Sequence, residues 1–175
     1  DLICSFVIAS LLMLNVQRMN AELVTRSTKS VNEFIAQGNA ATLSEIINYD
    51  LQKVGYGVTG SKITLADATH LTFYADMDRN GAADSVRYVL GGFVPRTTNP
   101  RDRLLNRLLN NQAPDSLSLG VTDLAFSYYD SAGAATATLA NIKGIQADLT
   151  VESTAPYDTS YAKSYVRVRI CPKNL

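Results

Sequence analysis

The first 54 residues carry a helical pattern of apolar and polar positions that changes character along its length. Residues 2–16 contain no charge, proline or glycine. Charges begin at Arg18, and from there apolar residues recur at the spacing of one helix face. The last apolar positions of this face are Leu43, Ile46, Ile47, Leu51 and Val54. We therefore predict one long helix over residues 1–54, apolar on all sides in its first half and amphipathic in its second.

Glycine residues mark two special points of this predicted helix. Gly38 and Asn39 lie in its middle, where glycine costs about 1 kcal/mol relative to alanine, so we expect a hinge there. Gly55 and Gly57 follow the last apolar position, and glycine suits the left-handed conformation that commonly closes a helix.

Residues 55–175 change to the alternating pattern of β-strands. The predicted strands are 62–65, 69–75, 85–90, 121–129, 136–138, 142–151 and 165–171. Residues 76–84 form a polar loop with a glycine, which predicts a hairpin, and residues 152–162 predict a surface loop. The expected fold class is α+β, with a stem helix over 1–54 packed on a mostly antiparallel sheet in a head over 55–175.

Residues 101–111 fit a helix and a strand almost equally well. Their leucines, at positions 104, 105, 108 and 109, recur at helical offsets. Their asparagines, at positions 106, 110 and 111, are poor helix formers. The pattern alone leaves both structures open.

The charge balance argues against a nucleic-acid partner. The chain has 16 basic and 16 acidic residues, so no broad basic field is available to hold a phosphate backbone. Arg167 and Arg169 alternate with apolar residues, which predicts the solvated face of a strand. Cys4 and Cys171 lie near opposite ends, and a helical stem would separate them by about 80 Å. We expect both thiols to be free or intermolecular.

One polar loop has the spacing of a calcium-binding loop. Asp76, Asp78, Asn80 and Asp84 stand at positions 1, 3, 5 and 9, and the Ala82 carbonyl falls at position 7. Oxygen ligands at alternate positions around a glycine turn are what Ca²⁺ needs. The usual glutamate at position 12 is absent, so any site would be open and weak. The alternative is an ordinary hairpin turn, in which Asp and Asn side chains bond their own backbone.

No catalytic set is visible in the sequence. His70 is the only histidine, and it lies in a predicted strand with no cysteine nearby, so we expect a structural role. Gly55 and Gly57 end a helix instead of opening one, unlike the glycines of a phosphate-binding loop. We therefore expect no enzyme activity and no required cofactor, with Ca²⁺ at residues 76–84 as the one candidate.

Three features together resemble a known family. They are the apolar helix that becomes amphipathic, the segment Asp50-Leu-Gln-Lys-Val-Gly-Tyr-Gly57, and the pair of stretches 121–133 and 142–151. In this order the chain resembles type IV pilins, most closely the W-type minor pilins and the J-type pseudopilins of type II secretion. The resemblance covers nearly the whole chain, and it favours a strand over residues 101–111.

The resemblance also gives the first residues an expected role. Asp1-Leu2-Ile3 is similar to the acid and apolar residues that follow the first few positions of mature family members, which implies that about four family-typical residues ahead of Asp1 are absent. Asp1 would then neutralise the N-terminal amine of a neighbouring subunit during assembly. The alternative is that an acid at this end only favours the helix dipole.

The function that the resemblance implies is structural. We expect a subunit of an extracellular type IV pilus-like filament on a bacterial or archaeal cell, held in the inner membrane before assembly. Its partners would be copies of itself, other pilins and the assembly machinery. The residues expected to mediate assembly are Asp1, Leu2, Ile3, Phe6, Val7, Leu11 and Leu14. The alternatives are a minor pilin or pseudopilin that primes or caps the filament, and a membrane-anchored binding domain that never polymerises.

Overall fold

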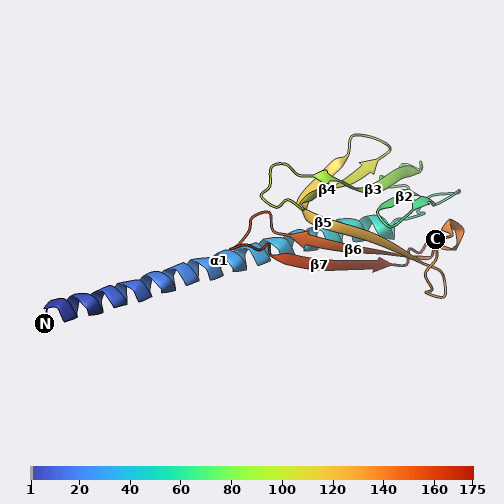
Figure 1. Ribbon diagram of the computed structural model, residues 1–175. Helices are drawn as coiled ribbons and strands as arrows, with labels where there is room; N and C mark the ends of the chain where they lie inside the picture. The colour runs from blue at the N-terminus through green and yellow to red at the C-terminus, as the bar shows by residue number, and fades with distance from the viewer. Residues whose placement is uncertain (1) are drawn as a thin grey trace.

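The computed structural model describes residues 2–175, which form one long helix and a β-rich head (Figure 1). The helix is α1 (Leu2–Gln52). The strands are β1 (Ile63–Ala66), β2 (His70–Ala75), β3 (Asp84–Phe93), β4 (Arg103–Leu109), β5 (Asp115–Tyr129), β6 (Gly144–Glu152) and β7 (Lys163–Ile170), with a short 3-10 helix η1 (Leu139–Asn141) before β6. The predicted α+β class is therefore confirmed.

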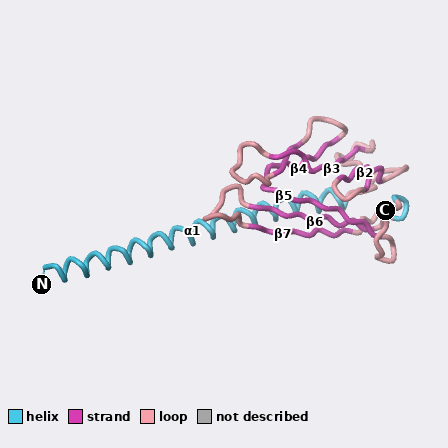
Figure 2. Tube along the Cα trace, viewed as in Figure 1, coloured by secondary structure: helices cyan, strands magenta, loops and turns pink. Residues whose placement is uncertain are grey.

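The strands form a simple antiparallel meander. The seven-stranded sheet of the described residues runs in sequence order from β1 to β7, and each strand pairs with the next along the chain (Figure 2). Every connection therefore joins two strands that lie side by side in the sheet. This is the arrangement expected when short connections link successive antiparallel strands.

Only the C-terminal part of α1 packs on the sheet. Leu43, Ile47 and Leu51 are fully buried and join Ile145 and Leu149 of β6 in one apolar core. Each large apolar side chain buried in this way contributes about 1.5–3 kcal/mol. The α1 helix contacts β5, β6 and β7, whereas residues 2–31 project away from the head (Figure 1). We call residues 2–31 the projecting segment.

The two glycines that follow α1 adopt the left-handed conformation that the sequence predicts. The helix ends at Gln52, and Gly55 and Gly57 adopt φ values of 77° and 70°. The Gly55 N–H donates to the Tyr74 carbonyl at 2.9 Å, which joins the end of the helix to β2. A Cβ atom at Gly55 would lie 2.9 Å from the Asn174 carbonyl oxygen, so this close approach requires glycine.

Residues 101–111 contain a strand, as the family resemblance indicated. Strand β4 pairs with β3 and β5, and Leu105 is fully buried in the core. Asn110 and Asn111 adopt φ values of 51° and 55°, the left-handed region that asparagine tolerates. The asparagines therefore make the turn after β4, and the helical spacing of the leucines was coincidental.

One sequence prediction about the head is wrong, and a second holds only in part. Residues 136–138 form no strand, because the chain makes only one bridge, from Tyr129 to Ala135, and then enters η1. The loop over residues 152–162 is not purely a surface loop, since Glu152, Ser153 and Ala162 are buried. The Ser153 hydroxyl donates to the Ala155 carbonyl and accepts from the Ala162 N–H, so a polar residue folds the loop onto the head.

The predicted hinge falls inside the part of α1 that packs on the head. The helix runs unbroken through Gly38 and Asn39, and Ala36 and Ala40 on either side are buried. A Cβ atom at Gly38 would meet nothing within 4 Å, so the glycine is not required by packing. The hinge stays a prediction that needs a measurement of local opening.

Candidate functional site

The projecting segment is an unusually large apolar surface without a partner in the molecule. Every residue from 2 to 31 is exposed. The large apolar side chains of its first half are Leu2, Ile3, Phe6, Val7, Ile8, Leu11, Leu12, Met13, Leu14 and Val16, all at least 50% exposed. Consecutive apolar residues point to all sides of a helix, so no single partner face could cover them. Such a surface requires an apolar environment around it.

The predicted assembly residues lie on this surface. Leu2, Ile3, Phe6, Val7, Leu11 and Leu14 all belong to the projecting segment, and none of them contacts the head. Asp1 lies outside the described residues, so its predicted pairing with a neighbour stays a prediction. The structure therefore leaves the six apolar side chains free for contacts with another molecule.

Polar side chains within the projecting segment bond to their own helix. The Ser10 hydroxyl donates to the Phe6 carbonyl at 2.8 Å, and the Asn15 amide donates to the Leu11 carbonyl at 3.0 Å. These bonds satisfy polar groups without water, which suits an apolar environment. By length and composition α1 is apolar enough to span a membrane, a test that a signal sequence also passes.

The head first contacts α1 at Lys29 and Asn32. The buried Asn32 side chain donates from Nδ2 to the Ala155 carbonyl at 3.1 Å, and the Lys29 ammonium lies 5.7 Å from the centre of the Tyr157 ring. Both contacts come from the loop between β6 and β7. The loop that was expected at the surface therefore forms the junction between the head and the projecting segment.

Near its other end α1 is fastened to the sheet by a buried ion pair. Asp50 accepts hydrogen bonds at Oδ2 from Arg107 Nε at 2.5 Å and from the Tyr88 hydroxyl at 2.6 Å. Its Oδ1 accepts from Arg107 Nη2 at 3.2 Å. The hydrogen-bonded Asp50 carboxylate raises the pKa of Arg107, and burial together with the Asp50 charge raises the pKa of Tyr88. Arg107 is therefore charged and Tyr88 protonated at neutral pH, and we call Asp50, Arg107 and Tyr88 the clamp.

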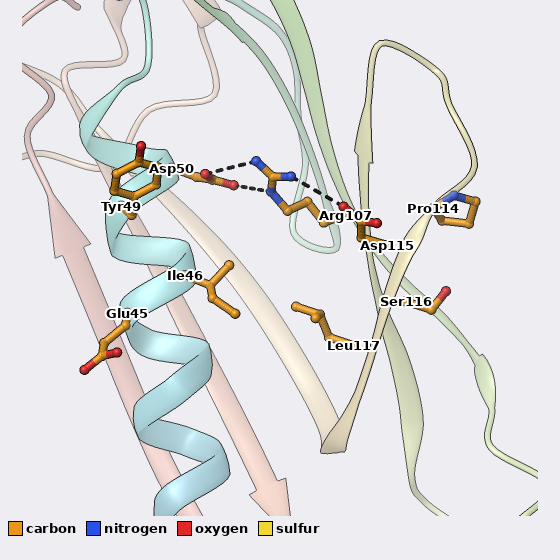
Figure 3. Close-up of a pocket in the computed structure, with 9 residues that line it drawn as sticks. All are labelled: Glu45, Ile46, Tyr49, Asp50, Arg107, Pro114, Asp115, Ser116 and Leu117. Atoms are coloured by element: carbon orange, nitrogen blue, oxygen red, sulfur yellow. Dashed lines mark hydrogen bonds and ion pairs between the residues drawn. The ribbon is translucent and has the colours of Figure 1, made fainter. Parts of the chain in front are cut away.

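A cleft of about 740 Å³ opens beside this clamp, between α1 and the start of β5 (Figure 3). It is lined by Glu45, Ile46, Tyr49, Asp50, Arg107, Pro114, Asp115, Ser116 and Leu117. Ile46 and Leu117 face one another across it, as Figure 3 shows. We call it the α1–β5 cleft.

Sequence reasoning missed both the clamp and the cleft. Asp50 was part of the segment that carries the family resemblance, but its partner Arg107 lies 57 positions away in a stretch whose secondary structure was ambiguous. No local pattern links two such residues. The one available signal was the position of Arg107 between two pairs of leucines, at 104–105 and 108–109.

The acidic loop brings together three of the predicted calcium ligands. Carboxylate oxygens of Asp76, Asp78 and Asp84 lie within 4.8 Å of one another. The same loop also makes the hydrogen bonds expected of an ordinary turn: Asp76 accepts from the Asn80 and Gly81 N–H groups, and Asn80 Oδ1 accepts from the Ala82 N–H. The loop thus has the carboxylates of a cation site and the internal bonds of a stable turn.

Both carboxylate oxygens of Asp84 already accept hydrogen bonds. Hydrogen bonds from the Asn110 side chain and the Met77 N–H lower the pKa of its carboxyl group. These donors occupy both oxygens, since Asn110 Nδ2 lies 2.6 Å from Oδ1 and the Met77 nitrogen lies 2.9 Å from Oδ2. A cation at this loop would share Asp84 with these donors.

A second buried carboxylate, that of Glu152, lies at the start of the loop between β6 and β7. Glu152 is 1% exposed and lies between Arg101 Nη2 at 2.8 Å and Lys163 Nζ at 3.2 Å, with an additional hydrogen bond from Asn99 Nδ2 at 3.0 Å. Asp102 is also fully buried, but neither of its oxygens has a hydrogen-bond partner among the described residues. Burial raises the pKa of the Asp102 carboxyl group.

The geometry around His70 does not form a catalytic relay. Asp67 Oδ1 lies 3.2 Å and Thr69 Oγ1 lies 2.9 Å from the same ring nitrogen, Nδ1. A relay needs the base to contact the nucleophile through one ring nitrogen and the carboxylate through the other. The Asp67 carboxylate instead accepts from the Thr69 and His70 N–H groups and shapes the turn before β2.

The predicted solvated face of β7 carries a local charge network. Arg167 Nε donates to Asp148 Oδ1 at 2.6 Å, the Tyr165 hydroxyl donates to the same oxygen at 2.7 Å, and Arg169 lies 4.1 Å from the centre of the Tyr129 ring. The two cysteines, Cys4 and Cys171, form no disulfide with each other, as predicted from their positions near opposite ends of the chain. Both thiols are exposed.

Comparison with known proteins found no match to a family model, to a curated protein or to a solved structure.

Proposed function

We propose that this chain is a structural subunit of an extracellular type IV pilus-like filament, which assembles through its projecting segment. The observation that carries the proposal is the exposure of residues 2–31, apolar on all sides over residues 2–16, on a helix whose other end is clamped to a folded head. A helix that is apolar all round is suited to burial among other helices or in lipid. The head then lies at the surface of the assembly.

The energetics favour assembly over a free monomer in water. Each large apolar side chain moved from water into a helix bundle contributes about 1.5–3 kcal/mol. The first half of the projecting segment holds many such side chains and no charge. Assembly among copies of the same chain covers every side of each helix at once, which a single flat partner surface cannot do.

The same segment suits storage in the inner membrane before assembly. Lipid and neighbouring helices are both apolar environments. Transfer of the segment from the membrane into the filament therefore exposes little apolar surface to water at any stage. The run over residues 2–16 is shorter than the roughly 20 residues of a complete membrane-spanning helix, but α1 continues beyond it and is by length and composition apolar enough to cross a membrane. Storage of this kind places the folded head outside the membrane on a bacterial or archaeal cell.

Two roles within a filament are consistent with this arrangement. A major subunit would build the shaft, whereas a minor pilin or pseudopilin would prime or cap it, together with other pilins and the assembly machinery. The resemblance to minor types is an argument for the second role, and the first role is the one in which this chain forms filaments by itself. Filaments purified from cells that consist mainly of this chain would indicate the first role, and trace amounts would indicate the second.

The proposal is tested by removing detergent from the purified full chain and imaging the product by electron microscopy. We expect filaments from the unchanged chain and none from Leu11→Asp, because the charge would be buried among apolar helices. Ser131→Asp, in an exposed turn of the head, is the matched control and should still assemble. A membrane-anchored domain that never polymerises would instead give monomers in detergent and no filaments without it.

A further inference from the structure

The α1–β5 cleft has an apolar interior and an acidic rim. Ile46, Tyr49, Pro114 and Leu117 contribute its apolar lining, and Glu45 and Asp115 stand at its edges (Figure 3). The guanidinium group of Arg107 is engaged already: Nε and Nη2 bond Asp50, and Nη1 lies 3.7 Å from Asp115. Because Glu45 forms no ion pair within residues 2–175, the charge that the cleft presents outward is negative.

The cleft exists because the sheet curves away from the helix. The α1 helix contacts β5, β6 and β7, while β4 and the first residues of β5 stand off from it on the clamp side. Tyr49 is 58% exposed although it lies between the buried residues Ile47 and Asp50. Asp50 and Arg107 of the clamp belong to the lining of the cleft.

The second half of the projecting segment has the complementary character. Residues 17–31 carry three basic side chains, of which Arg26 pairs with Glu22 at 2.7 Å and Lys29 lies 3.8 Å from Glu33. Within residues 2–175, Arg18 is the basic side chain of this stretch that forms no ion pair. Met19 and Leu23 lie on one side of the helix, one turn apart, and both are at least 60% exposed. These residues follow the uncharged run, so a purely apolar environment suits them less well than residues 2–16. They need a partner surface that is apolar in the middle and acidic at its edge.

We propose that the α1–β5 cleft of one copy receives the segment Arg18–Arg26 of a second copy in the assembled filament. Met19 and Leu23 would enter between Ile46 and Leu117, and Arg18 would lie near Glu45. This is the binding of an amphipathic helix face in an apolar groove, with opposite charges setting the register. The inference rests on the proposed function, since it requires two copies with parallel stems.

The length of the helix permits this contact. Residues 18–26 precede the cleft residues of α1 by roughly 40 Å at about 1.5 Å per residue. The projecting segment extends beyond the head by roughly 45 Å on the same scale, so a neighbour displaced by about 40 Å along a shared axis places its basic stretch beside the cleft. The contact therefore joins each head to the stem of another copy, whose apolar run would lie level with roughly residues 28–42 of the first copy.

Cross-linking of assembled full-length chains tests this contact. In a background with Cys4→Ser and Cys171→Ser, we would introduce Leu23→Cys in the stem and Ser116→Cys in the cleft, and treat the assembled chain with a short bis-maleimide. Each copy then carries both partners, so we expect a ladder of covalent multimers. The matched control replaces Ser116→Cys with Ser131→Cys, an exposed serine outside the cleft, and should give no ladder.

The outcomes separate this contact from the function on which it rests. Filaments that give no ladder with Ser116→Cys, or an equal ladder with Ser131→Cys, would overturn the contact and leave the filament proposal standing. A chain that forms no filaments would overturn both. Unchanged thermal melting of each variant in detergent shows that a missing ladder does not result from misfolding.

A charge exchange gives a second readout of the same contact. Glu45→Arg and Arg18→Glu should each slow filament formation, because each places like charges together. The two changes combined should restore assembly toward the rate of the unchanged chain. Equal inhibition by the double variant and the single variants would contradict the pairing.

Discussion

Asp50 and Arg107 form a two-point ion pair that fastens the end of α1 to β4, with contacts of 2.5 Å from Nε to Oδ2 and 3.2 Å from Nη2 to Oδ1. Asp50 is 1% exposed, and its carboxylate also accepts a hydrogen bond from the Tyr88 hydroxyl. The Asn32 amide makes a second polar contact, to the Ala155 carbonyl at 3.1 Å. Polar contacts therefore hold α1 to the head at both ends of its packed part, next to the point where the projecting segment leaves the head.

Loss of the arginine should destabilise the head strongly. Arg107→Met leaves the Asp50 charge buried without a cationic partner, and we expect the free energy of unfolding to fall by about 3–5 kcal/mol. Urea denaturation measures it. Arg167→Met, which breaks the exposed pair with Asp148, is the matched control and should change stability far less, because solvent screens that pair. Similar losses in the two variants would contradict the clamp.

Asp102 should make the head less stable as pH rises. Burial raises the pKa of its carboxyl group in the folded state above the ordinary value of 3.8. The folded state therefore holds the proton more tightly than the unfolded state. The stabilising contribution is complete below the unfolded pKa and is lost as pH rises through the folded pKa.

Asp102→Asn should remove this pH dependence. We expect the variant to be more stable than the unchanged chain at neutral pH, where the buried carboxylate is charged, and to lose that advantage in acid. Urea midpoints at a series of pH values measure the effect. A variant that is less stable at neutral pH would show that the Asp102 charge is favourable in the folded head.

Calcium binding at residues 76–84 predicts a shift in thermal stability. At a free Ca²⁺ concentration of ten times the dissociation constant, a single site stabilises the folded state by about 1.4 kcal/mol. Melting in millimolar Ca²⁺ and in chelator measures this difference, and Asp78→Asn should abolish it because Asp78 is the exposed carboxylate of the cluster. Equal melting temperatures in the two conditions would leave only the hairpin turn.

The hinge prediction at Gly38 is tested by stabilising the helix there. A Cβ atom at Gly38 would meet nothing within 4 Å, so Gly38→Ala should raise helix stability by about 1 kcal/mol without disturbing packing. Hydrogen exchange measures the opening of the amides near Asn39. If the unchanged chain exchanges there no faster than at Leu43, the hinge is excluded.

Local sequence patterns predicted the elements of this fold better than its long-range contacts. The apolar run and the glycines at 55 and 57 determine the helix and its end through local geometry, so α1 was predicted to within two residues of its C-terminus. The stretch around Arg107 was ambiguous because pairing with β3 and β5, which lie elsewhere in the chain, decides its structure.

Buried polar residues were the main source of error. Glu152 begins a polar stretch and was expected at the surface. In the fold it is buried, and the positive charges of Arg101 and Lys163 offset the cost of removing its carboxylate from water. Such compensation depends on residues brought together only by the fold. The α1–β5 cleft was invisible for the same reason, since its two walls come from distant parts of the chain.

The central claim is that copies of this chain cover one another's projecting segments. A three-dimensional electron microscopy reconstruction of the particles formed by the full chain after detergent removal tests it most directly. We predict a filament in which the helices of residues 2–31 pack together along the axis, with the heads outside. Isolated monomers, or disordered clusters in which the helices share no regular packing, would contradict the claim.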